Sequence, residues 1–142
     1  QDILDKGGFL ALVEWAEEGE RINLNVKGED MGRVIGKEGA TLKALGIITA
    51  TILSRSYGEK VLLSVDAEGY RDKRVKSLER LAKEVADEVA ETGQEKVLPP
   101  MEAADRRSIH LFLQNDPKVT THSQGEGRDR RLVIVSRETF PG

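Results

Sequence analysis

The stretch that decides the fold of this chain is a pair of glycines that opens a helix, Val34-Ile35-Gly36-Lys37-Glu38-Gly39-Ala40-Thr41-Leu42. Gly36 and Gly39 accept backbone angles that other residues avoid, so they permit a tight turn whose amides face outward. The apolar residues that follow predict a helix over about residues 39–56, closed by Gly58 as a left-handed cap. The positive end of that helix adds to the amides, and both favour a nucleic-acid phosphate.

On the N-terminal side of this stretch the sequence predicts a hairpin. Residues 9–16 are typical of a strand, and in residues 21–27 apolar and polar residues alternate. On the C-terminal side, residues 60–66 predict a strand whose continuous apolar centre indicates burial on both faces. A long helix with a regular apolar stripe follows over about residues 70–92. A three-stranded sheet covered by helices on one face is the economical fold.

The remaining residues predict a second small domain, with the boundary near Gly93. Pro99-Pro100 suits the first turn of a helix, which would carry Ile109, Leu111 and Phe112 among its apolar residues. Two strands, over about residues 119–123 and 131–136, should pair antiparallel. The sequence therefore predicts an α+β fold of two domains, residues 1–93 and residues 94–142.

Composition narrows the class of protein. The chain has 142 residues, 33% of them charged and 38% hydrophobic, as expected of a globular protein with small cores. It has no cysteine, which excludes disulfides and cysteine-based zinc sites and fits a reducing, cytoplasmic location. No apolar run reaches the ~20 residues of a membrane span. The net charge of −3 argues against a general polyanion binder, so any nucleic acid should contact local basic surfaces.

A second group of candidate residues lies on the helix of the second domain. Arg106 and His110 are four residues apart and therefore project from one face, with Arg107 beside them. A guanidinium and an imidazole both donate hydrogen bonds to phosphate oxygens. The structural alternative is that Arg106 pairs with Glu102 and that His110 bonds a backbone carbonyl.

These motifs resemble those of a known family. The Ile-Gly-x-x-Gly turn that opens a helix is similar to the GXXG loop of K-homology (KH) domains, which clamp single strands. The later motif resembles the R-three-H domain, named for its Arg-x-x-x-His. Its matching residues are Arg106, Arg107, His110, Thr120, Thr121, Ser123, Gly125, Arg130, Arg131 and Val133. A KH domain followed by an R-three-H domain is the arrangement of the bacterial Jag family (SpoIIIJ-associated, also called KhpB or EloR).

The resemblance implies a prokaryotic-type KH sheet and a non-catalytic, cytoplasmic protein that binds single-stranded RNA. It links the chain to post-transcriptional control of cell elongation and division. A KH-only protein is the implied partner, and a homodimer is left open. No cofactor, metal or catalytic residue is implied, and members usually carry a separate N-terminal Jag module. The implied RNA-binding residues are Ile35, Gly36, Lys37, Glu38, Gly39, Arg106, Arg107, His110, Arg130 and Arg131.

Two departures from the family pattern affect these expectations. Residues 102–104 are Glu-Ala-Ala where members commonly have Asn-Pro-Tyr, so contacts of that tyrosine cannot be carried over. Glu38 lowers the positive charge of the loop, which leaves Lys37 as its one cationic side chain. A protein-binding scaffold, single-stranded DNA binding, and a hydrolase with His110 as base are the alternatives. The loop hypothesis predicts that Gly36→Asp with Gly39→Asp removes most RNA binding and leaves the fold intact.

Overall fold

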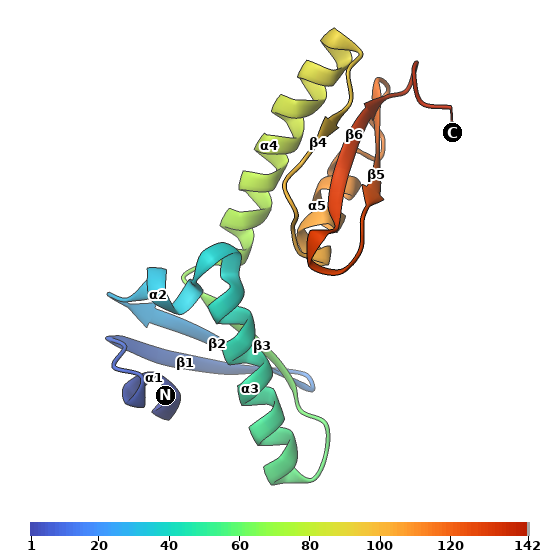
Figure 1. Cartoon of the computed structure of the whole chain (residues 1–142). Coiled ribbons are helices and arrows are strands. Elements are labelled where there is room, and N and C mark those ends of the chain that lie inside the picture. Colours follow the sequence, from blue (N-terminus) through green and yellow to red (C-terminus); the bar gives the residue numbers. More distant parts are fainter. Residues whose placement is uncertain (142) are drawn as a thin grey trace. The chain divides into compact units, whose positions relative to one another are not determined.

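Alternating apolar residues build the sheet of the N-terminal part in the computed structural model, which describes residues 1–141. Strands β1 (Ala11–Glu18) and β2 (Arg21–Gly28) pair antiparallel around a tight turn at Gly19. Strand β3 (Leu62–Ala67) lies parallel to β2, so the order is β1-β2-β3 (Figure 1). The three-stranded sheet that the sequence predicts is confirmed.

Helices pack on the apolar face of this sheet. They are α1 (Asp2–Lys6), α2 (Met31–Ile35) and α3 (Ala40–Tyr57), and α3 packs against β3. Val26, Val34 and Leu42 lie in the shared core. The predicted end of α3 is confirmed, because Gly58 caps it in the left-handed conformation at φ 73°. The sequence interpretation did not include α1, whose five residues are too few for a periodic pattern.

Strand β3 is not buried on both faces, so that prediction was wrong. Val65 and Ala67 are 5% and 1% exposed, but Leu62 is 36% exposed. The reason is topological, because β3 is an edge strand and the helices of this unit cover one face. An apolar run shows that a strand has a buried side, while its place in the sheet decides whether the second side is also covered.

The C-terminal part has its own sheet and core. Helix α4 (Tyr70–Thr92) leads into β4 (Lys96–Val97), α5 (Ala103–Leu113), β5 (Val119–Gln124) and β6 (Arg131–Ser136). The strand order is β4-β6-β5, and both pairings are antiparallel (Figure 1), which confirms the predicted pairing of the last two strands. Ile109, Leu132 and Ile134 are among the fully buried residues of this core.

The helix of the second domain does not begin at the two prolines, as the sequence suggested. It begins at Ala103, and Pro99-Pro100 belong to an extended segment that lies alongside β6. The amide of Leu98 donates to Leu132 at 2.9 Å, and the amide of Met101 donates to Arg130 at 3.3 Å. Proline has no N–H, so the pair fits between these two bonds where no donor is required.

The chain divides by packing into two compact units, Gln1–Asp72 and the residues from Lys73 onward. This division lies well before the boundary that the sequence predicts near Gly93. The reason is the apolar stripe of α4, since Leu78, Ala82 and Val89 lie in the core of the second unit. The length and regularity of α4 make it look like the end of the first domain, but its packing partners follow it in the sequence.

Candidate nucleic-acid interface

The two glycines of the predicted loop take the conformations that the sequence argument requires. Gly36, which ends α2, has φ 71° and ψ −176°, and Gly39, which precedes α3, has φ 79°. Glu38 between them is also left-handed, at φ 53°. An L residue rarely adopts such angles, so the chain reverses sharply over residues 36–39. The turn directs Lys37 and Glu38 away from the core, and both side chains are exposed.

The backbone of this turn leaves two amides for a ligand. The Gly36 amide donates to the Gly32 carbonyl at 2.9 Å, and the Gly39 amide donates to Gly36 at 3.4 Å. The amides of Lys37 and Glu38 have no acceptor within residues 1–141. They lie at the positive end of α3, a helix of 18 residues. Two free donors beside a helix N-terminus form a site that suits one phosphate group.

The apolar residues around the loop belong mainly to the core. Val34 is 0% exposed and Leu42 is 4% exposed, so neither is placed to flank a base. Leu42 belongs to the core of this unit. Ile35 is half-buried and packs against the same core, so part of its side chain borders the turn.

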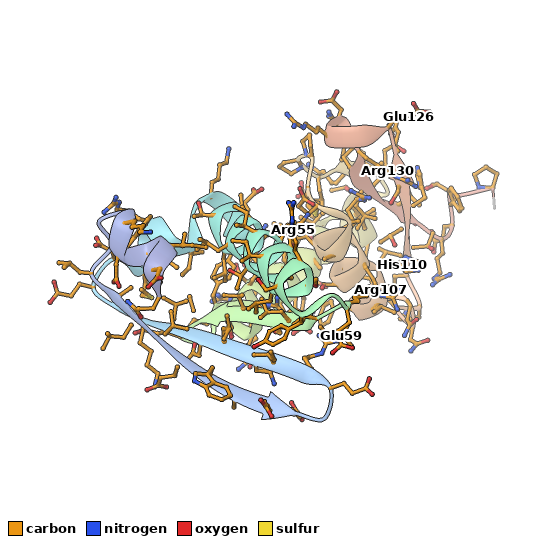
Figure 2. All side chains as sticks on the ribbon, turned by 90° about the horizontal axis from the view of Figure 1, so that it is seen from below. Arg55, Glu59, Arg107, His110, Glu126 and Arg130 are labelled. Carbon is orange, nitrogen blue, oxygen red and sulfur yellow. The ribbon has the colours of Figure 1, made fainter. Side chains whose placement is uncertain are left out.

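The second candidate surface is a groove between α5 and β5. Arg106, Arg107 and His110 line it from α5, Thr121 and Ser123 line it from β5, and Arg130, which precedes β6, also lines it. We call these six residues the α5–β5 groove. Arg107, His110 and Arg130 are exposed (Figure 2), and three guanidinium groups around one imidazole make the groove strongly basic. The structure therefore brings together four of the five residues predicted for this surface.

His110 is held by a neighbouring strand. Its Nδ1 lies 2.6 Å from the Thr121 hydroxyl oxygen. The structural alternative, a bond from His110 to a backbone carbonyl, is not found within residues 1–141. With Nδ1 engaged, the second ring nitrogen, Nε2, is the one left for a ligand. A histidine fixed in this way presents one polar atom in one direction.

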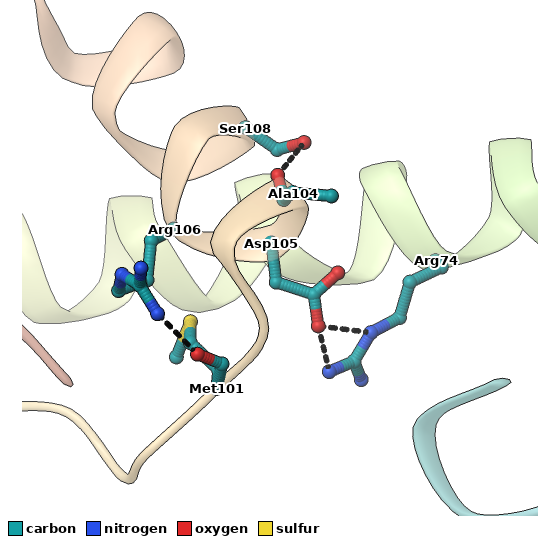
Figure 3. A network of polar contacts seen from close by, with 6 residues as sticks. All are labelled: Arg74, Met101, Ala104, Asp105, Arg106 and Ser108. Atoms are coloured by element: carbon teal, nitrogen blue, oxygen red, sulfur yellow. Dashed lines mark hydrogen bonds and ion pairs between the residues drawn. The ribbon is translucent and has the colours of Figure 1, made fainter. Parts of the chain in front are cut away.

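Arg106 is partly used by the protein itself. Its Nη1 donates to the Met101 carbonyl at 2.5 Å, and the side chain is half-buried (Figure 3). The bond goes to a backbone carbonyl and holds the extended segment against the start of α5. Arg106 therefore has a structural role, and its remaining N–H groups border the groove.

Arg131 does not line the groove with the other cations. Its Nε donates to the Asp129 carbonyl at 3.3 Å, and its side chain is half-buried. Arg130 precedes β6 and is exposed, whereas Arg131 is the first residue of that strand. Successive side chains of a strand point to opposite faces, which explains why two adjacent arginines separate.

An ion pair fixes α5 on α4 directly beside the groove. Arg74 donates to one carboxylate oxygen of Asp105, from Nε at 3.2 Å and from Nη2 at 2.7 Å (Figure 3). The two side chains are 25% and 14% exposed, so solvent screens the pair less than a surface pair. Asp105 precedes Arg106, and the pair therefore sets the position of the helix turn that carries Arg106 and Arg107.

The sequence interpretation gave no role to His122, which also borders the groove. Its ring stacks on Phe140, with the ring centroids 5.5 Å apart. Its Nδ1 is buried and has no hydrogen-bond partner within residues 1–141. Its position beside Thr121, in a predicted strand that carries family residues, was the one signal in the sequence that could have indicated it.

Comparisons with known proteins identify the two domains that carry these surfaces. The model of the KhpA/KhpB KH domain matches residues 10–65, and the model of the R-three-H domain matches residues 76–136. The chain belongs to the Jag (KhpB) family. An RNA-binding protein KhpB from Clostridium symbiosum is 40% identical over 86% of this chain and 55% of its own length. One from Bacillus subtilis is 38% identical over 83% of this chain and 58% of its own length.

The match to these relatives covers only part of the length of each relative. The chain spans about half the length of the curated KhpB proteins that it matches. An RNA-binding protein KhpA from Thermotoga maritima is 38% identical over 48 residues, which is 33% of this chain and 64% of the relative. No helix within residues 1–141 is long and apolar enough to cross a membrane. Over the same residues, no cluster of acidic and histidine side chains is arranged to hold a metal ion.

Proposed function

We propose that this chain binds single-stranded RNA through two surfaces, the loop at residues 36–39 and the α5–β5 groove, without catalysing a reaction. The observation that carries the proposal is the pair of free amides at Lys37 and Glu38, in a turn that two left-handed glycines hold open. The relatives named RNA-binding protein KhpB support the choice of ligand. The groove supplies the cationic contacts that the loop largely lacks.

Single strands fit these surfaces better than duplexes. A KH loop clamps the backbone of unpaired nucleotides so that their bases can be read. The net charge of −3 limits indiscriminate binding to polyanions and leaves the basic groove as a local exception. Single-stranded DNA is the closest alternative, and only the contacts to a 2′-hydroxyl would separate the two. A direct comparison of RNA and DNA of one sequence therefore belongs in every binding measurement.

Lys37→Asp with Glu38→Asp is expected to weaken RNA binding by at least about tenfold, because the loop loses its one cation and a second carboxylate joins the one at position 38 beside the phosphate. Both positions are exposed, and aspartate tolerates the left-handed angles of position 38. The fold should therefore be retained. His110→Gln with Arg107→Gln should weaken binding separately, and the four substitutions together should remove it. Filter binding of labelled single-stranded RNA at several salt concentrations measures both effects.

Glu59→Asp with Lys60→Asp is the matched control for the loop. It makes the same two replacements in an exposed loop after α3, with the same change in net charge. This control should bind RNA as the wild type does. Equal losses in both variants would indicate a general effect of charge, and wild-type affinity in the loop variant would contradict the proposal. A wild-type chain without saturable, salt-sensitive binding would favour the scaffold alternative.

We also propose that the outer face of α3 binds a second KH domain, from a KH-only partner or from another copy. Ile47, Ile48 and Ile52 are 59%, 49% and 52% exposed. Exposed apolar side chains grouped on one helix are typical of protein interfaces. Ile48→Glu with Ile52→Glu is expected to convert an assembled species to a monomer in sedimentation equilibrium, with RNA binding of the monomer retained. A wild type that is monomeric and does not bind a KH-only protein would exclude this interface.

The biological role proposed here is post-transcriptional control in the cytoplasm, linked to cell elongation and division as the family resemblance implies. Crosslinking the protein to RNA in cells, followed by sequencing of the attached fragments, tests this role. Targets enriched in transcripts for elongation and division are expected. A set of fragments that follows transcript abundance alone would contradict a regulatory role.

A further inference from the structure

Four cations form a row along the first two thirds of α4. Lys73, Lys76, Arg80 and Lys83 follow one another at steps of three or four residues, which places them on one side of the helix. Together with Glu79 and with Phe112 of α5, they line a shallow hollow of the second unit. All four cations and Phe112 are exposed. We call the four cations and Phe112 the α4 stripe.

Most of these charges are not used within the protein. Lys83 pairs with Asp87 at 3.0 Å, but Lys73, Lys76 and Arg80 make no ion pair within residues 1–141. Lys76 and Arg80 are four residues apart, so their like charges repel each other on the helix surface. Glu79 lies four residues before Lys83, but Lys83 pairs with Asp87 instead. The row therefore keeps an excess of positive charge.

Much of the charge along α4 also runs against the helix dipole. Asp72 in the first turn suits the dipole, but Lys73 beside it does not. Glu88 and Glu91 lie near the C-terminus, where basic side chains are favoured. The last turn contains no basic residue. Reversing these positions would stabilise the helix, so folding alone does not account for the order. A bound polyanion along the first half of α4 does account for it.

Phe112 adds an aromatic surface to the row of cations. Its side chain is 43% exposed, and a chain with only 3 phenylalanines would be expected to bury each of them. Grooves in which cations contact the nucleic-acid backbone and an exposed aromatic ring stacks on a base are typical of proteins that hold single-stranded nucleic acid. An acidic protein segment would match the cations but would not require the ring. The combination therefore favours a nucleic acid over an acidic protein.

The α4 stripe is distinct from the α5–β5 groove. Phe112 follows His110 by two positions, and at about 100° per residue the two side chains project from nearly opposite sides of α5. Ile109 and Leu113 occupy the buried side between them. A nucleotide held by His110 therefore cannot be the one that contacts Phe112.

We propose that the α4 stripe binds the phosphate backbone of single-stranded RNA and stacks one base on Phe112, as a second contact surface within the second unit. The inference rests on the RNA binding proposed above and adds a site to it. Lys73, Lys76 and Arg80 contact successive phosphates along the first half of α4. The groove and the α4 stripe then bind different nucleotides of one longer strand or of two strands.

Lys73→Gln with Lys76→Gln and Arg80→Gln is the test of the row. Each lost phosphate contact lowers the slope of log affinity against log salt by about 0.7, so the slope should fall by about 2. Phe112→Ala should weaken binding on the order of tenfold and leave the slope unchanged, because stacking involves no counterion release. Filter binding of the full chain with an unstructured single-stranded RNA over a salt series measures both quantities.

Lys6→Gln with Lys60→Gln and Lys118→Gln is the control, because it removes the same charge from exposed positions outside all three surfaces. Its salt slope should equal that of the wild type, and melting curves should show that every variant is folded. If the wild type binds RNA but the row variant keeps its slope, this inference is overturned while the proposed function stands, and an acidic protein becomes the expected occupant. The inference is also overturned if the salt slope falls by the same amount in the row variant and in the control. No binding by the wild type overturns both proposals.

Discussion

Replacing Gly36 and Gly39 together with aspartate is expected to damage the first unit as well as to stop RNA binding. A β carbon at Gly36 would overlap the Thr41 side chain, and one at Gly39 would lie 2.8 Å from the Tyr70 ring. Both positions also require left-handed angles, which disfavour a side chain by ~1–2 kcal/mol each. Overpacking adds ~1–3 kcal/mol at each site. We therefore expect the free energy of unfolding to fall by about 4 kcal/mol or more.

Urea unfolding followed by circular dichroism measures this loss, and hydrogen exchange of residues 1–72 locates it. Gly58→Asp is the matched control, because Gly58 has φ 73° but an added β carbon would meet no atom within 4 Å. It should lower the free energy of unfolding by about 1 kcal/mol, which is the conformational part alone. A double variant as stable as the Gly58 variant would show that the Thr41 and Tyr70 side chains move aside at little cost. The glycine variant would then test RNA binding as directly as the Lys37 and Glu38 variant does.

The sequence predicted this loop correctly as a turn, but it could not show what surrounds the turn. The spacing of two glycines ahead of a helical pattern is a local signal, and the observed angles agree with it. The contact between Gly39 and Tyr70 joins residues far apart in the chain, so no local pattern contains it. This contact argues against the expectation that two aspartates would leave the fold intact.

The second domain shows the same limit in a different form. The Arg-x-x-x-His spacing correctly placed Arg106 and His110 on one side of a helix, beside a groove. The start of that helix was wrong, because the preference of proline for a first helical turn competes with pairing along β6, which only the fold reveals. The separation of Arg130 from Arg131 likewise depends on where β6 begins.

Apolar residues of α5 were also treated alike in the sequence, although the structure separates them. Ile109 is 0% exposed in the second core, whereas Leu111 is 45% exposed. Composition within a short helix does not give its phase, because 11 residues supply only three turns. Packing against α4, with the Arg74–Asp105 pair, fixes that phase.

Ile109→Ala is expected to lower the free energy of unfolding of the second unit by about 3 kcal/mol. The side chain is fully buried among Leu78, Val119 and Ile134, and truncation of such a residue costs ~2–5 kcal/mol through lost contacts and a cavity. Most single domains are stable by only ~5–15 kcal/mol, so the loss is a large fraction. Urea unfolding of the full chain measures it, with hydrogen exchange of the residues from Lys73 onward to assign it to this unit.

Leu111→Ala on the same helix is the control, and it should change the free energy of unfolding by less than about 0.5 kcal/mol because nearly half of the side chain is already in water. The comparison tests more than stability. Ile109 and His110 are adjacent, so an inward Ile109 fixes His110 about 100° away, toward Thr121 and the groove. Equal losses in the two variants would mean that α5 is rotated from the described phase. His110 and Arg106 would then no longer share the groove on which the second RNA surface depends.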